Sequence, residues 1–111
     1  MPSTDTRSTE EIIAEMTRRI VEQFDPLQVI LFGSHARGDA RADSDVDLLV
    51  VFPTVENNRQ MRISIRGALR DLPVAKDIIV ATPDEIRRAQ HRFGTILKPA
   101  VREGHVLFQH P

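Results

Sequence analysis

The stretch Val29–Phe52 constrains the fold more than any other part of the chain. It opens with a short apolar run, Val29–Phe32, which predicts a buried strand. Gly33 ends the run and lets the backbone pass close to a bulky ligand. Ser34 is then expected to be the N-cap of a short helix that Gly38 closes. The N-terminus of a helix attracts phosphate, although many turns of this kind bind nothing.

Two carboxylates, Asp45 and Asp47, follow after ten intervening residues, directly before a second apolar run that ends at Phe52. Alternate side chains of a strand share a face, so the two carboxylates point the same way, roughly 6.5–7 Å apart along the strand. Val46 points the other way, into the core. Carboxylates at that separation can flank two divalent cations about 3.5–4 Å apart. The alternative is a hydrated loop that merely precedes a strand.

The two halves of this stretch can form one site only if the two strands run antiparallel. The phosphate-binding turn lies at the C-terminal end of the first strand, whereas Asp45 and Asp47 lie at the start of the second. Few residues connect the strands, which favours an antiparallel pair. We therefore expect the turn at Gly33 to meet both carboxylates, in an arrangement suited to a metal-bound nucleoside triphosphate.

Helices and strands alternate along the rest of the chain. A capping box at Ser8–Glu11 predicts a first helix in which Glu15 and Arg19 can pair. Further elements are expected as a helix at 55–71, a strand at 74–81, a helix opened by a capping box at 82–85, a short helix at 95–103 after Gly94, and an edge strand at 105–108. This order predicts an α/β (α+β) fold, a small mixed sheet of three to four strands flanked by helices.

Arginines at helical spacing occupy the outer face of the predicted helix at 55–71. They are Arg59, Arg62, Arg66 and Arg70, and Ile63 lies among them. A solvated charged face is the simpler interpretation. The presence of Ile63 favours the alternatives, which are a docking surface for an acidic partner or a contact with the nucleotide or substrate.

Composition excludes several classes of protein. The 111 residues suffice for one modest domain, in which 1–7 are expected to be flexible. The net charge of −1 gives no sign of general affinity for nucleic acid or membranes. Cysteine is absent, which excludes disulfides, thiolate metal sites and a cysteine nucleophile. The polar N-terminus and the lack of any long apolar run favour the cytoplasm over secretion or a membrane.

The spacing of Gly33-Ser34 and Asp45-x-Asp47 resembles the signature of the DNA polymerase β-type nucleotidyltransferase superfamily. Chain length and the order of elements are most similar to its minimal nucleotidyltransferases, the MNT proteins, with residues 1–111 as a single domain. The resemblance implies a polymerase β-like nucleotidyltransferase fold, two Mg²⁺ ions and ATP as the donor. It also implies a third metal-binding acid in the strand after the intervening helix, where Asp77 is the only carboxylate.

This resemblance suggests a role for each candidate residue. Asp45, Asp47 and Asp77 would be catalytic and would hold the metal ions, while Gly33 and Ser34 would bind the β- and γ-phosphates. The metal ions held by these carboxylates would neutralise the polyanionic triphosphate while a hydroxyl attacks its α-phosphorus. The alternative role for Asp77 is a salt bridge within the sheet, which an ionised carboxylate among apolar residues would need.

Basic residues also flank the expected phosphate site. His35 follows Ser34 and could approach the triphosphate, and Arg37 and Arg41 are close to it in sequence. Solvated positions for these side chains remain an equally good interpretation. The four histidines of the chain show no spacing typical of a metal site.

The acceptor of the nucleotide is expected to come from another chain, because only about eight residues follow the last predicted helix. MNT proteins are often paired with a HEPN-type ribonuclease toxin, and some transfer AMP to a tyrosine hydroxyl of that toxin. The resemblance therefore implies a protein adenylyltransferase that acts as the antitoxin of such a pair, within a homo- or hetero-oligomer. Two alternatives stay open: an antitoxin that acts by contact alone, and a small-molecule nucleotidyltransferase with a site completed by dimerisation.

Overall fold

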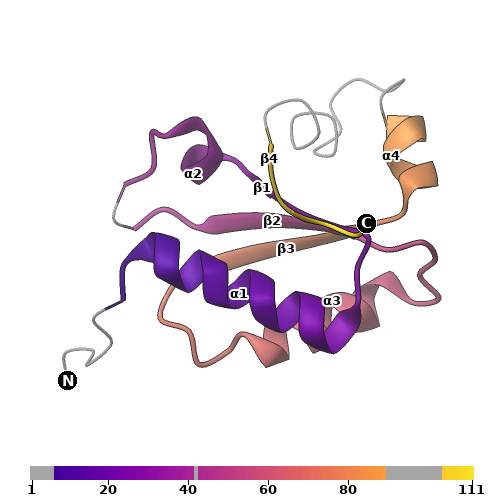
Figure 1. Cartoon of the computed structure of the whole chain (residues 1–111), viewed down its shortest axis with the longest axis horizontal. Coiled ribbons are helices and arrows are strands. Elements are labelled where there is room, and N and C mark those ends of the chain that lie inside the picture. The colour runs from indigo at the N-terminus through magenta and orange to yellow at the C-terminus, as the bar shows by residue number, and fades with distance from the viewer. Residues whose placement is uncertain (1–6, 42, 90–103) are drawn as a thin grey trace.

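The computed structural model of the protein describes residues 7–41, 43–89 and 104–111. Its elements, in chain order, are α1 (Thr9–Phe24), β1 (Gln28–Phe32), α2 (Ser34–Arg37), β2 (Val46–Val51), α3 (Asn58–Ala68), β3 (Lys76–Ala81), α4 (Pro83–Ala89) and β4 (His105–Gln109). Figure 1 shows α1 and α3 together on one side of the sheet, with α2 and α4 near its opposite ends. No described helix is long and apolar enough to cross a bilayer.

The sheet has four strands in the order β3-β2-β1-β4. β1 pairs antiparallel with β2, as expected from the short connection between them, and also with β4 on its other side. β2 pairs parallel with β3, so the chain crosses over through α3 between these two strands. The predicted mixed sheet, the antiparallel pair and the edge strand near the C-terminus are all confirmed.

The two faces of the sheet bury different apolar side chains. Val46, Leu48 and Val50 of β2 point towards α1 and α3, where they join the larger core cluster. Leu49 and Val51 point to the other face and belong to a smaller cluster that includes Ile86 of α4. Both faces of β2 are apolar beyond Asp47, so this strand lies at the centre of the core. The polar residues at its start lie at the end of the sheet.

α1 begins as its sequence predicts. The Ser8 hydroxyl accepts a hydrogen bond from the Glu11 N–H at 3.1 Å, and the Glu11 carboxylate accepts one from the Ser8 N–H at 3.3 Å, which completes the capping box. The core-facing side chains of the helix are Ile12, Ile13, Met16 and Ile20. Asp25, in a left-handed conformation with φ of 53°, ends the helix before Pro26.

α3 is shorter than the predicted helix at 55–71, and both predicted ends are wrong. The helix starts at Asn58 because the Asn57 side chain caps it by accepting a hydrogen bond from the Gln60 N–H at 3.0 Å. Beyond its last turn the ammonium group of Lys76 donates to the Leu69 carbonyl at 3.0 Å and to the Leu72 carbonyl at 3.1 Å. These carbonyls are satisfied by β3 rather than by a continuing helix, so the chain can turn early.

The second capping box is also confirmed. The Glu85 N–H donates to the Thr82 hydroxyl at 3.2 Å, and the Thr82 N–H donates to the Glu85 carboxylate at 3.1 Å, at the start of α4. The predicted break at Gly94 and the predicted helix at 95–103 lie outside the described residues.

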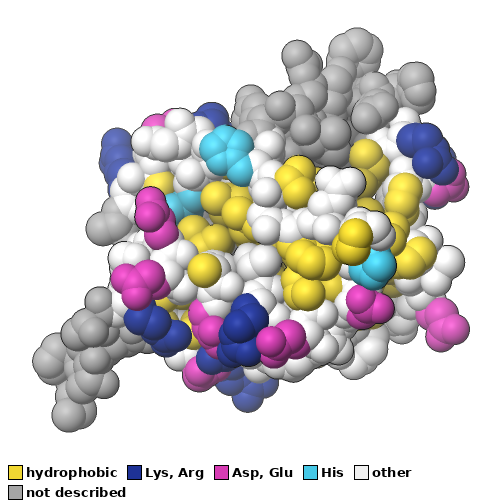
Figure 2. Space-filling view, viewed as in Figure 1, with side chains coloured by type: hydrophobic (Ala, Val, Ile, Leu, Met, Phe, Trp, Pro, Cys, Tyr) yellow, Lys and Arg dark blue, Asp and Glu magenta, His cyan; other side chains and the backbone are white. Residues whose placement is uncertain are grey.

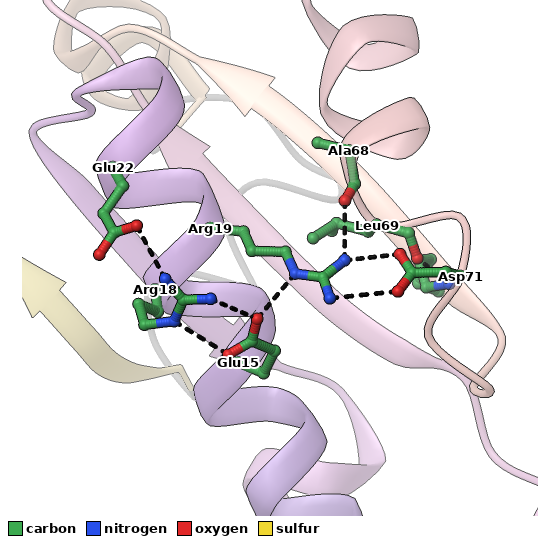
Figure 3. Close-up of polar contacts among 8 residues, drawn as sticks. Glu15, Arg18, Arg19, Glu22, Ala68, Leu69 and Asp71 are labelled. Atoms are coloured by element: carbon green, nitrogen blue, oxygen red, sulfur yellow. Dashed lines mark hydrogen bonds and ion pairs between the residues drawn. The ribbon is translucent and has the colours of Figure 1, made fainter. Parts of the chain in front are cut away.

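A network of ion pairs joins α1 to the turn that follows α3 (Figure 3). Arg19 pairs with Glu15 at 2.8 Å, as predicted, and reaches Asp71 at 2.6 Å. Hydrogen bonds from Arg18 and then Arg19 lower the pKa of Glu15 to about 2. Arg19 also donates to the Ala68 carbonyl at 3.1 Å, so one guanidinium holds the end of α3 against α1.

Ile65 and Ile63 offer a matched test of this packing. Ile65 is fully buried on the core-facing side of α3, whereas Ile63, two residues earlier on the same helix, is 51% exposed. We expect Ile65→Ala to lower the free energy of unfolding by about 2–5 kcal/mol, because it leaves a cavity in the core. Ile63→Ala should change it by less than about 0.5 kcal/mol. Urea unfolding of both variants checks this, and equal losses would contradict the described orientation of α3.

Candidate active site

The turn after β1 is built on Gly33. This glycine has φ of 74° and ψ of −154°, a conformation that residues with a side chain rarely adopt. It is the N-cap of α2, and Ser34 is the first residue of the helix, so the prediction that Ser34 is the N-cap is wrong by one position. Gly38 closes the helix in a left-handed conformation, as predicted.

The first turn of α2 presents polar groups at the end of β1. The Gly33 carbonyl accepts hydrogen bonds from the N–H groups of Ala36 and Arg37, at 3.1 and 3.0 Å. Within the described part of the chain, the N–H groups of Ser34 and His35 make no backbone hydrogen bond, as is usual for the start of a helix. These groups and the Ser34 hydroxyl can therefore bind an anion.

Asp47 and Asp77 lie side by side in the sheet. They are register partners in the parallel ladder of β2 and β3, whose strands lie about 4.8 Å apart. Their side chains alternate with the buried Leu48 and Ile78, so both point to the face that α1 and α3 do not cover. Asp45, two residues before Asp47, is exposed at the same end of the sheet.

The carboxylate of Asp47 also lies against the turn at Gly33. Phe32, the last residue of β1, is the register partner of Asp47 across the antiparallel pair. A Cβ atom added to Gly33 would clash with the Asp47 carboxylate. The predicted meeting of the turn with the carboxylates is therefore confirmed for Asp47, where it depends on the missing side chain of a glycine, and it stays a prediction for Asp45.

Like charges concentrate around Asp47. Burial is the main cause that raises the pKa of the Asp47 carboxyl above its usual range, followed by repulsion from Asp77 and Asp45. His35 and Arg37 act in the opposite direction, but their effects are smaller. All three predicted acids are thus close enough to interact electrostatically, which is the arrangement that their proposed common role requires.

The three carboxylates suit a hard divalent cation. In the described part of the chain, none of them accepts a hydrogen bond or takes part in an ion pair, and Asp77 does not pair with Lys76. Carboxylate oxygens are the ligands that Mg²⁺ prefers. Among the described residues, however, no three His, Asp or Glu side chains are close enough to form a ready-made metal site. The side chains would have to draw closer around an ion, as expected for carboxylates that repel one another.

His35 has a structural contact that the sequence did not reveal. Its Nε2 lies 3.2 Å from the carbonyl oxygen of Ser44, the residue directly before Asp45. Ser44 also closes the preceding turn, because its hydroxyl accepts a hydrogen bond from the Arg41 N–H at 2.8 Å. His35 therefore connects α2 to the loop that carries Asp45. Arg37 is exposed and pairs with Asp39 at 3.4 Å.

A wide groove beside α1 does not contain the three acids. It has a volume of about 990 Å³ and lies between α1, α2 and β4, lined by Ile13, Val21, Leu31, His35 and Phe108 among others. Figure 2 shows hydrophobic side chains gathered on this face beside α1. The groove touches α2 through His35, but none of the three carboxylates lines it. The groove is therefore not taken as the candidate active site.

Comparison with known proteins gives the family. The sequence profile of the nucleotidyltransferase domain matches residues 13–102, which includes the Gly33 turn and all three acids. The chain belongs to this nucleotidyltransferase domain family. Its four-stranded mixed sheet with flanking helices is the polymerase β-like fold of the minimal nucleotidyltransferases.

Two curated relatives carry names that are more specific than the family description. A candidate protein adenylyltransferase of Methanocaldococcus jannaschii is 39% identical over 70 residues, which are 61% of this chain and 46% of that protein. The protein adenylyltransferase MntA of Thermococcus cleftensis is 39% identical over 46 residues, 41% of this chain and 46% of MntA. The matches thus span about half the length of the relatives.

A solved structure supports the fold. It is a mutant of the toxin–antitoxin complex MntA-HpeT, with a TM-score of 0.64 and 19% sequence identity over 94% of this chain and 75% of the solved one. At this level of identity the likeness concerns the fold alone.

Replacement of Gly33 tests the contact between the turn and Asp47. We expect Gly33→Ala to lower the free energy of unfolding on the order of 1–3 kcal/mol, because alanine is strained in this backbone conformation, and to displace the Asp47 carboxylate. Gly67→Ala is the matched control, since a Cβ there has nothing within 4 Å. That change should stabilise α3 by up to about 1 kcal/mol. A stable Gly33→Ala variant with unchanged unfolding would contradict the described turn.

The crowded charges predict a dependence of stability on pH. The pKa of the Asp47 carboxyl is higher in the folded protein than its unfolded value of 3.8. The stability contributed by the protonated carboxyl is therefore lost as the pH rises from the unfolded pKa through the folded pKa. In a chelator at pH 7, we expect Asp47→Asn to raise the melting temperature relative to the wild type. Asp43→Asn, on the exposed loop nearby, is the control and should have little effect. A lower melting temperature for Asp47→Asn would be inconsistent with repulsion at this site.

Proposed function

We propose that this protein is a Mg²⁺-dependent nucleotidyltransferase that transfers AMP from ATP to a hydroxyl of a partner protein. The observation that carries the proposal is the position of Asp47, which lies between the Gly33 turn and Asp77. This position would bring the proposed phosphate site next to the proposed metal-binding carboxylates. Few functions other than handling a metal-bound polyphosphate require both.

Each residue of the site has a distinct task in this proposal. The N–H groups at the start of α2 and the Ser34 hydroxyl hold the β- and γ-phosphates, and Gly33 allows them to approach Asp47. Asp45, Asp47 and Asp77 hold the metal ions. Bound Mg²⁺ supplies neutralisation of the triphosphate charge and lowers the pKa of the attacking hydroxyl.

The reaction proceeds by direct displacement. The acceptor oxygen forms a bond to the α-phosphorus, the bond from that phosphorus to the bridging oxygen breaks, and pyrophosphate leaves with the electron pair. Asp77 is exposed at the start of the edge strand β3, so an acceptor can reach it. It receives the hydroxyl proton as the new bond forms.

The partner is proposed to be a HEPN-type toxin that this protein silences by modification. Support comes from the relatives, one of which is named the protein adenylyltransferase MntA, while an MntA-type fold occurs in a toxin–antitoxin complex. The protein would then act as an antitoxin, within the cytoplasm and in a complex with its target.

Transfer of AMP can be measured directly on the partner. We expect incubation with ATP, Mg²⁺ and the HEPN protein encoded beside it to raise the mass of that protein by one AMP. The double variant Asp45→Asn/Asp47→Asn should reduce the rate by at least about a hundredfold, because it removes two metal ligands. Asp43→Asn is again the control, and mass spectrometry gives the readout.

Binding must be measured in the same experiment. If the two chains bind but the partner gains no mass, the adenylyltransferase proposal fails. If the Asp45→Asn/Asp47→Asn variant still protects cells from the toxin, inhibition works by contact alone. Magnesium and ATP together should also raise the melting temperature of the wild type, and this shift should be lost in Asp47→Asn.

A further inference from the structure

α3 carries a set of basic side chains that the proposed chemistry does not use. Arg59, Arg62 and Arg66 lie on the helix, and Arg70 lies two residues beyond its end. All four arginines are exposed, and Ile63 among them is 51% exposed. The helix itself contains no Asp or Glu. We call these five residues the α3 face.

The arginines of the α3 face differ from those of α1 and α4 in their partners. Arg18 and Arg19 of α1 pair with carboxylates at 2.6–2.9 Å, and Arg87 of α4 pairs with Asp84 at 2.8 Å. In the described ranges of the chain, no ion pair involves an arginine of the α3 face. Arg66 donates only to the Lys76 carbonyl, at 3.2 Å.

The carboxylate nearest to this face in the sequence is already engaged. Asp71 follows Arg70 directly, but its two oxygens accept hydrogen bonds from Arg19 of α1, at 2.6 and 3.1 Å (Figure 3). Arg19 therefore takes the acid that could have neutralised Arg70. The α3 face keeps its positive charge although the whole chain has a net charge of −1.

A groove leads from the α3 face to the active site. It has a volume of about 600 Å³, and it is lined by Ile63, Arg66, Arg70, Lys76 and Asp45 among others. The Val46 N–H donates to the carbonyl of Ala75, which lines the groove, at 2.9 Å, so the residue after Asp45 is tied to the start of β3. Asp45, one of the three proposed metal-binding acids, thus borders the same groove as an exposed apolar side chain and two guanidinium groups that form no ion pair within the described residues.

We propose that this groove is where an acidic segment of the protein acceptor docks, with its carboxylates on Arg66 and Arg70, an apolar side chain on Ile63 and its hydroxyl residue towards Asp45. The proposal rests on the proposed function and names the surface that selects the acceptor. Arginine is well suited to carboxylates because its planar group can donate two parallel hydrogen bonds. An uncharged hydroxyl residue avoids repulsion from Asp45.

Nucleic acid fits this face less well. Single strands bind to basic grooves that also offer aromatic side chains for base stacking. The residues that line this groove include no aromatic side chain. Ile63 in the middle of the arginines favours a polypeptide, which can present an apolar side chain between carboxylates.

The test uses a labelled synthetic peptide with one Tyr and one Leu among Glu and Asp residues, and a second peptide with Gln and Asn in place of the acids. Binding is measured by fluorescence anisotropy at low salt, without ATP or Mg²⁺. We expect the acidic peptide to bind and the amide peptide not to bind. Arg66→Gln/Arg70→Gln should weaken binding about tenfold, the loss of about 1.4 kcal/mol. Arg87→Gln/Arg88→Gln, with the same change of charge on α4, should have no such effect.

The outcomes separate this proposal from the proposed function. Equal binding of the two peptides, equal losses in the two double variants, or tighter binding of an RNA or DNA oligonucleotide to the α3 face would overturn the docking proposal. Ile63→Ala should also weaken the acidic peptide, and its stability is checked by urea unfolding. Because no nucleotide is present, these results are independent of AMP transfer. Failure of transfer with normal peptide binding would count against the proposed reaction alone.

Discussion

The close approach of the Gly33 backbone to the Asp47 carboxylate is the constraint on which the site depends. The antiparallel register of β1 and β2 sets Phe32 opposite Asp47, so the residue after Phe32 must lie beside that carboxylate. Only glycine leaves room for it. The same residue has the backbone conformation that starts α2. One position therefore determines both where the proposed phosphate-binding groups lie and how close they come to the acids.

This arrangement has a cost in the free protein. Burial and two neighbouring carboxylates disfavour the ionised form of Asp47, and a cluster of like charges destabilises the fold. The deep apolar packing of β2 beyond this point compensates, since Leu48, Leu49 and Val50 are fully buried. The strand thus combines a stable interior with a strained polar start. Sites of this kind are commonly functional, because a bound cation relieves the repulsion.

The sequence predicts the local parts of the site well. The short connection to β1 was enough to predict the antiparallel pair. The common face of Asp45 and Asp47 stays a prediction, because β2 begins at Val46 and Asp45 lies outside the strand. Ser34 was misplaced as the N-cap because glycine and serine both occur at that position and the pattern does not separate them. The role of Asp77 could be predicted only from the family resemblance. Its register with Asp47 depends on the whole crossover through α3, which the local sequence does not show.

Contacts between distant residues could not be predicted. Lys76 ends α3 through carbonyls of the preceding turn, and nothing in the local pattern marks a lysine for that role. Arg19 and Asp71 are separated by 52 positions, so their pairing appears only once α1 and α3 share a face of the sheet. The sequence accordingly left the role of the α3 arginines open between a solvated face and a docking surface.

The pairing of Arg19 with Asp71 bears both on the packing of α1 against α3 and on the proposed docking at the α3 face. It holds α1 against the end of α3, and it also withdraws a carboxylate from the neighbourhood of Arg70. Exposed charges are screened over about 10 Å at 0.1 M salt, so the α3 arginines act on a partner only at short range. A groove that also offers Ile63 provides such contact. A structural ion pair on one side of the helix thus leaves the α3 arginines available for the proposed docking of a partner on the other.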